Sequence, residues 1–209
     1  MLQAPFIELA YFVGRDRVDT ALSTVLKRSA VVGLAPSRRI GSNVYAISNL
    51  IGLARDEEAE THGGRIILRT EGEIFCGSAR TKKRKLLASG RKVYERFLSY
   101  VSVLDPFYGA ILLEYSLEEP DELRSDPRSL AFRDFYVASR VLGSRDMQQL
   151  RALAGTDSFV QEMPNGIYVS TTEECNPEGR SVESVQAQET SVAIGNLLGS
   201  LRLLDKGRR

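Results

Sequence analysis

The stretch Leu104–Leu117, LDPFYGAILLEYSL, decides the fold that this sequence predicts. In an extended strand its side chains alternate between two faces, and both faces are apolar until Glu114. A strand that is apolar on both faces is typical of the middle of a sheet, where other layers cover it on each side. The pattern therefore predicts a long central strand over about 106–117, which the rest of the chain must cover.

The composition is that of a folded globular protein. The chain has 209 residues, of which 43% are hydrophobic and 26% are charged, whereas a disordered chain carries far fewer apolar residues. This length suits one domain with a sizeable core. We therefore expect a single globular α+β domain over 1–209, with a frayed tail over 205–209. The net charge of +1 argues against a protein that mainly coats nucleic acid or an acidic membrane.

Cysteine content and hydropathy indicate the compartment. Cys76 and Cys175 are too few for a disulfide framework, so we expect free thiols in a reducing environment. The N-terminal segment lacks the basic start of a signal peptide. No apolar run approaches the roughly 20 residues needed to cross a bilayer. These observations predict a soluble cytoplasmic protein without a membrane partner.

Helix and strand patterns alternate along the chain without an internal repeat. Asn165-Gly166 between two alternating runs predicts a hairpin of strands 159–163 and 167–171. A second hairpin is expected from strands 65–70 and 73–76, joined through Glu71-Gly72. The other elements expected are a strand over 5–13, helices over 16–32, 81–101, 144–153 and 182–204, and a loop or short helix over 118–127.

Two segments leave their conformation open. Residues 37–54 fit a short strand or a helix, and residues 128–142 fit either as well, with a preference for strand in the middle. Hairpins favour antiparallel pairing, and the order of elements does not resemble a doubly wound fold. The sequence therefore predicts an α+β fold in which a mainly antiparallel or mixed sheet packs against several helices, which cover mainly one face.

The side chains that most often carry catalysis or bind cofactors are scarce. His62 is the single histidine, and it lies in an exposed glycine-rich turn with no nucleophile beside it in the sequence. One histidine and two unrelated cysteines exclude the common zinc patterns. Neither a phosphate-binding glycine motif nor a nucleophile elbow occurs. We therefore predict no cofactor and no metal, and favour a protein that is not an enzyme.

Carboxylates provide the main alternative, which is a hydrolase or transferase. Acidic residues are frequent in the central third of the chain, and two that face one cleft would suffice for acid–base catalysis. Such a site would involve Asp105, Glu114 or acidic residues nearby, a group that extends to Asp134. A carboxylate such as Glu114, on an otherwise apolar strand, must be paired, protonated or at the end of the sheet. A salt bridge to a basic helix would satisfy it without any function.

Charges of opposite sign gather in separate segments. The outer face of the helix expected near 80–96 is basic, whereas residues 55–60 and 118–126 are acidic. Segregated charge steers association and selects partners without catalysis. We therefore predict a non-catalytic domain that binds a partner protein through charged faces, as an inhibitor, immunity factor or complex subunit. The residues expected to contact this partner are Lys82, Lys83, Arg84, Lys85, Arg91, Lys92, Glu118, Glu119, Asp121 and Glu122.

A weak nucleic-acid binder is the second alternative, again through the basic helix at 80–96. Proteins that bind single strands usually add aromatic rings on which bases stack. Tyr94 and Phe97 belong to the stripe of this helix that is expected to be buried. They are therefore not available for stacking, and a protein partner is favoured.

Overall fold

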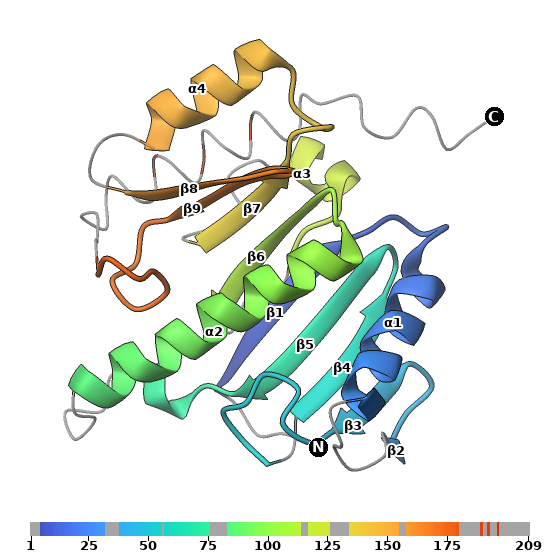
Figure 1. The fold of residues 1–209 in the computed structure, drawn as a ribbon. Coiled ribbons are helices and arrows are strands. Elements are labelled where there is room, and N and C mark those ends of the chain that lie inside the picture. The colour runs from blue at the N-terminus through green and yellow to red at the C-terminus, as the bar shows by residue number, and fades with distance from the viewer. Residues whose placement is uncertain are drawn as a thin grey trace.

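The computed structural model describes residues 5–31, 38–55, 57–75, 83–113, 117–125, 134–154 and 158–179, and the single residues 189, 192 and 196. Its strands form one nine-stranded sheet in which every paired neighbour is antiparallel. Helices pack against this sheet, so the predicted α+β class is confirmed (Figure 1). The strands are β1 (Phe6–Phe12), β2 (Arg38–Arg39), β3 (Val44–Ile47), β4 (Glu57–His62), β5 (Arg65–Glu71), β6 (Tyr108–Leu113), β7 (Asp134–Ala138), β8 (Phe159–Met163) and β9 (Gly166–Ser170).

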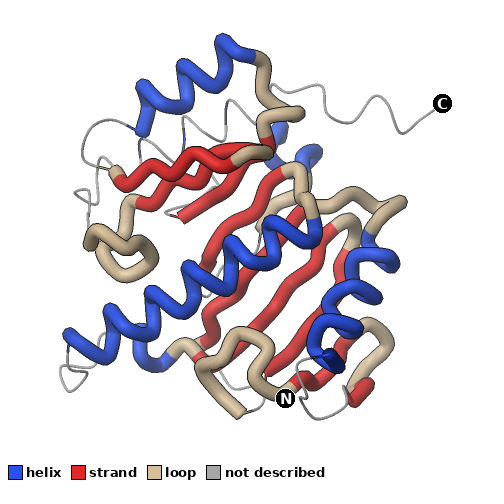
Figure 2. Tube along the Cα trace, viewed as in Figure 1, coloured by secondary structure: helices blue, strands red, loops and turns tan. Residues whose placement is uncertain are grey.

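Three of the four helices listed next come from segments with a helical apolar stripe, and the other forms in the polar segment 118–127. The four are α1 (Val18–Val31), α2 (Lys83–Leu104), α3 (Pro120–Ser125) and α4 (Ser144–Ala154), with one 3-10 turn, η1 (Glu73–Phe75). Figure 2 shows α1 and α2 crossing the same face of the sheet. At the other end of the sheet, α4 packs beside the edge strand β8. Of the helix predicted over 182–204, the structure describes residues 189, 192 and 196, each of which is helical; the tail over 205–209 and Cys76 lie outside the described residues.

The segment quoted first forms β6, which lies inside the sheet as predicted. The strand order is β2-β3-β4-β5-β1-β6-β7-β9-β8, so β6 has a neighbour on each side. Residues 108–112 are buried, because both faces of the strand are apolar. Gly109 allows β1 to approach closely, since a Cβ at this position would lie 2.7 Å from the Ala10 carbonyl oxygen. Residues 114–116 of the predicted strand lie outside the described residues.

Aromatic side chains fix α2 on the sheet. The Tyr11 ring of β1 stacks on Phe97 of α2, with 5.1 Å between the ring centroids. The Tyr11 hydroxyl donates a hydrogen bond to the Phe97 carbonyl oxygen at 3.2 Å. Both side chains are fully buried, and burying aromatic rings of this size contributes strongly to stability. Because its inner side is held in this way, the outer side of α2 has a fixed orientation.

The ambiguous segments and the second hairpin are now assigned. Residues 37–54 contribute the short strands β2 and β3 followed by turns, and 128–142 contains β7, as its middle favoured. The hairpin at Asn165-Gly166 is confirmed as β8 and β9. The hairpin predicted through Glu71-Gly72 is wrong. Strand β5 continues beside β1 as far as Glu71, and its hairpin partner is β4, across the turn at Gly63-Gly64.

The sequence predicted an exposed acidic face at residues 55–60. This prediction is wrong, because residues 57–60 belong to the inner strand β4. Glu57 and Glu58 are buried. Arg69 of β5 lies directly opposite Glu58 in the strand register, and its guanidinium forms ion pairs with Glu60 at 3.2 Å and with Glu8 of β1 at 2.7 Å. Cross-strand pairing therefore compensates charge that in the sequence looks like a solvated run.

Candidate protein-binding face

The exposed side of α2 carries five of the basic residues predicted to contact a partner. The buried positions of this helix recur every three or four residues, from Gly90 to Leu104, and turn its apolar stripe to the sheet. The opposite side consequently faces solvent. Basic residues are exposed there in the first turn and again two turns later, and Lys83 is exposed at the start of the helix. We call this set the basic face; it consists of Lys83, Arg84, Lys85, Arg91 and Lys92.

Acidic neighbours balance only part of this charge. Lys83 Nζ lies 2.5 Å from a carboxylate oxygen of Glu173, and this hydrogen bond raises the pKa of the lysine. Arg91 pairs with Glu95 one helical turn away, at 3.2 Å. Among the described residues, the other three members of the basic face form no ion pair. The predicted residue Lys82 lies outside the described part of the chain.

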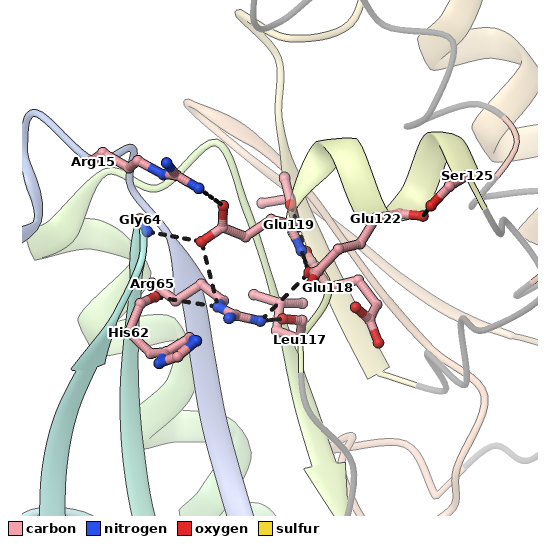
Figure 3. Close-up of polar contacts among 10 residues, drawn as sticks. Arg15, His62, Gly64, Arg65, Leu117, Glu118, Glu119, Glu122 and Ser125 are labelled. Atoms are coloured by element: carbon pink, nitrogen blue, oxygen red, sulfur yellow. Dashed lines mark hydrogen bonds and ion pairs between the residues drawn. The ribbon is translucent and has the colours of Figure 1, made fainter.

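The acidic residues of the predicted site lie elsewhere, in and before α3. Figure 1 shows α3 far from the first turn of α2. Glu119 turns inward, with 13% of its side chain exposed. Its carboxylate accepts hydrogen bonds from the Gly64 amide and from Arg15 Nη2, both at 3.0 Å (Figure 3). Burial raises the pKa of Glu119, but these hydrogen bonds outweigh it and leave the pKa below its usual value.

Arg65 is the centre of the contacts drawn in Figure 3. Its side chain is only 8% exposed, and Nη1 donates to the Leu117 carbonyl oxygen at 2.5 Å. The guanidinium also lies 3.8 Å from Glu119 and 3.7 Å from Glu122. A buried cation needs such partners to offset its lost hydration. The acidic segment therefore acts as a structural tie between α3 and the β4–β5 turn.

The other three predicted acidic residues differ in exposure. Asp121 is exposed in the first turn of α3, and Glu122 beside it is half exposed. Glu118 is partly buried, and its carbonyl oxygen accepts a hydrogen bond from the Tyr108 hydroxyl at 2.7 Å. The structure thus separates the predicted residues into two areas, and it leaves the basic face as the more exposed of the two. Whether either area binds a partner stays a prediction.

Of the two carboxylates named for the enzyme alternative, the structure describes Asp105. Asp105 has a positive φ of 45° just after α2 and forms an ion pair with Arg140. Arg17 donates to the carbonyl oxygens of Leu104 and Asp105 at 3.0 and 3.2 Å. The hydrogen bonds from Arg17 satisfy backbone carbonyl groups at the C-terminal end of α2, so these contacts are structural. Glu114 lies outside the described residues.

The structure also shows the surroundings of His62 and Cys175. His62 is exposed at the end of β4, and its carbonyl oxygen accepts a hydrogen bond from Arg65 Nε at 3.3 Å. Cys175 is a buried free thiol, and burial raises its pKa well above the usual value. Within the part of the chain that the structure describes, no three potential metal ligands gather.

Asp134, one of the acidic residues that crowd the central third of the sequence, is buried in the structure. It is 4% exposed at the start of β7, opposite Ser170 of β9. The hydroxyl groups of Ser170 and Thr172 donate to its carboxylate at 2.5 and 2.8 Å. Burial raises its pKa from 3.8 to about 7, although these hydrogen bonds oppose the shift. The pairing of β7 with β9 brings Asp134 to Ser170, a contact that the local sequence does not indicate.

Comparison with known proteins gives little further information. No family model matches the chain, and no curated protein matches it. Among solved structures, the chain is similar to the Pseudomonas aeruginosa T6SS protein PA0821, with 11% sequence identity and a TM-score of 0.48. That likeness covers 95% of this chain and 73% of the other, and at this level it carries no argument about function. Within the described residues, no helix has the length and apolar character of a membrane span.

Proposed function

We propose that this protein is a non-catalytic interaction domain that binds a partner protein through the basic face of α2, as an inhibitor, immunity factor or complex subunit. The observation that carries this proposal is the basic face itself, five exposed cations of which three have no ion pair among the described residues. Charge of one sign on a rigid helix selects a partner surface of the opposite sign and speeds encounter with it. We therefore expect an acidic partner surface.

The acidic residues of the predicted site have a smaller part in this proposal. Glu119 is turned toward Arg15 and Gly64, so its carboxylate is already satisfied. Asp121 and Glu122 are exposed, and Glu122 also contacts Arg65 at 3.7 Å. Because α3 lies far from the first turn of α2, a partner that touches both areas must be large enough to reach across the molecule (Figure 1).

A protein partner is favoured over nucleic acid by the position of the aromatic rings. Tyr94 and Phe97 of α2 are buried, and Tyr94 packs at 5.4 Å against Tyr168 of β9. The basic face consequently offers charge without rings on which bases stack. A nucleic acid held by charge alone would show a steep dependence of affinity on salt and little preference for sequence.

The experiment compares two variants with the same change of net charge. The test variant is R84E/K85E/R91E/K92E, which reverses the basic face but keeps Lys83 and its ion pair with Glu173. The control variant reverses four exposed basic residues on other elements, as K27E/R38E/R55E/R145E. Each tagged protein is used to capture proteins from a lysate of its source cells, once before and once after nuclease treatment. The captured protein is then purified, and its affinity for both variants is measured.

We expect the control variant to bind the captured protein with nearly wild-type affinity and the test variant to lose binding by at least about tenfold. Equal binding by the two variants would refute the role of the basic face. Capture that disappears after nuclease treatment would assign the face to nucleic acid. Far-UV circular dichroism and urea unfolding of both variants confirm that they are folded.

A further inference from the structure

A pocket of about 340 Å³ opens at the edge of the basic face, between α2 and the turns at 48–55. This volume is at the small end of the range for ligand sites, so the pocket suits a single side chain or a small anion. Lys92 belongs both to the pocket and to the basic face. The lining residues are Asn49, Ile51, Gly52, Lys92, Glu95, Arg96 and Ser99.

The wall formed by the turns is held in place by one buried carboxylate. Glu57 of β4 has no exposed surface, and it accepts hydrogen bonds from four consecutive backbone amides, residues 51–54, at 2.5 to 3.2 Å. Asn49 and Gly52 have left-handed backbone, with φ of 56° and 90°. Non-glycine residues seldom adopt this conformation without support from their surroundings. The wall is therefore built before any ligand arrives, which lowers the entropy cost of binding.

The charges around the pocket favour an anion. Lys92 and Arg96 are one turn apart on α2, and within the described residues neither forms an ion pair. Arg96 Nη2 lies 3.7 Å from the position that a Cβ on Gly52 would occupy, so its guanidinium lies against the wall. Glu95 is the one carboxylate among the lining residues, and it already pairs with Arg91 at 3.2 Å.

Ser99 supplies a directed donor at the other end of the pocket. Its hydroxyl oxygen accepts a hydrogen bond from Arg28 Nη2 at 3.0 Å, while Arg28 Nη1 donates to its carbonyl oxygen at 3.2 Å. The hydroxyl hydrogen has no acceptor among the described residues. It is thus available to an oxygen atom of a ligand, next to a guanidinium that is well suited to carboxylates.

We propose that this pocket receives an aspartate or glutamate side chain of the partner protein. The inference rests on the proposed function, because the pocket is continuous with the basic face through Lys92. Arg96 pairs with the carboxylate, Ser99 donates a hydrogen bond to it, and Lys92 adds positive charge at the mouth. Charge-assisted hydrogen bonds of this kind are stronger than neutral ones, so the pocket anchors the interface while the basic face attracts the partner.

The test uses a fluorescein-labelled hexaglutamate peptide as the acidic probe, with binding followed by fluorescence anisotropy at low salt. The K92M/R96M variant removes the two pocket cations, and R84M/K85M removes two cations of the basic face that do not line the pocket. We expect at least about a tenfold loss of affinity for the first and less than about threefold for the second. S99A, which leaves the net charge unchanged, should weaken binding by about two- to fivefold.

Several results would overturn the pocket assignment. Equal losses for the two double variants would show diffuse attraction, and so would an unchanged affinity of S99A. Displacement of the peptide by inorganic phosphate at about a hundredth of the concentration of glutarate would assign the pocket to a phosphate ligand. If the basic-face reversals abolish partner capture while K92M/R96M behaves like R84M/K85M, the proposed function stands and the pocket proposal fails. If the reversals leave capture intact, the proposed function itself fails. Urea unfolding of each variant confirms that it is folded.

Discussion

Replacing Asp134 with asparagine should make the stability of this protein less dependent on pH. Asp134 is buried at the start of β7, and its surroundings raise its pKa from 3.8 to about 7. Asparagine has nearly the same shape and still offers an oxygen to the hydroxyl groups of Ser170 and Thr172. The substitution therefore removes the titration of this site while changing the packing around it very little.

The sign of the effect follows from where the proton is bound. Between pH 4 and pH 7 the folded protein holds a proton on Asp134 that the unfolded chain has already released. The contribution of this group to stability is therefore complete below about pH 4 and is lost as pH rises toward 7. Each unit of pKa corresponds to about 1.4 kcal/mol, so the whole shift corresponds to about 4 kcal/mol. That is a large fraction of the 5 to 15 kcal/mol typical of a folded domain.

Urea unfolding of the wild type and of Asp134→Asn, measured between pH 4 and pH 8, tests this directly. The chain has no tryptophan and eight tyrosines, so far-UV circular dichroism or tyrosine fluorescence reports unfolding. The difference between the two free energies of unfolding should change by up to about 4 kcal/mol in favour of the variant as pH rises. Asp16→Asn, at an exposed position, is the matched control and should follow the wild-type curve. Parallel curves for the wild type and Asp134→Asn would refute the reasoning.

Three other substitutions test structural contacts by the same urea measurement. Arg65→Met should lower the free energy of unfolding by about 3 to 5 kcal/mol, because it removes a buried cation from its acidic partners; a loss under about 1 kcal/mol would contradict its central place. Glu57→Gln should lower it by about 2 kcal/mol and speed hydrogen exchange of the amides at 51–54, and unchanged exchange would argue against the carboxylate as their anchor. Gly90→Ala should destabilise by about 1 to 3 kcal/mol, since the added Cβ would lie 2.1 Å from the Glu174 carbonyl oxygen. A gain of about 1 kcal/mol, as helix propensity alone predicts, would show that this contact gives way easily.

The elements that could be predicted are those whose signal is local. The hairpin at Asn165-Gly166 needs only its own turn residues and the alternation beside them. Helix α2 follows from its apolar stripe, and Gly90 within it appears unfavourable only in the sequence. In the structure, Gly90 leaves room for the backbone at Glu174, which crosses the helix there. A residue that weakens the helix locally is therefore required by the tertiary packing.

The turn between β4 and β5 shows where local signals fail. Both Gly63-Gly64 and Glu71-Gly72 are plausible turns, and the choice between them depends on a strand from another part of the chain. The Gly72 amide donates to the Pro5 carbonyl oxygen at 2.8 Å, at the end of the pairing between β5 and β1. A Cβ on Gly72 would lie 2.7 Å from the Phe6 carbonyl carbon, so this glycine serves close strand packing. Its sequence signature is the same as that of a turn.

The basic part of the candidate site could be predicted from the sequence, whereas the acidic part could not. A helical stripe determines which side of α2 is exposed, so the basic face could be located from periodicity alone. The acidic segment could not be judged in this way, because its partners are distant in the sequence. Arg15 is 104 positions away from Glu119, and Arg65 is 52 positions away from Leu117. The contacts of Arg15 and Arg65 neutralise part of the acidic charge in the segment 118–126. The sequence of this segment is nevertheless as strongly charged as that of α2.

Formal charge in a sequence window and charge available at a surface are therefore different quantities. Of three charged segments, the acidic run in β4 is largely buried and cross-paired, and the acidic segment at α3 is partly neutralised by Arg15 and Arg65. The basic face is the segment in which most cations keep their charge toward solvent. A charged side chain that is already paired within the protein contributes less to the binding of a partner than an unpaired one. This is why the proposal of a partner rests on α2 and predicts that the partner is acidic.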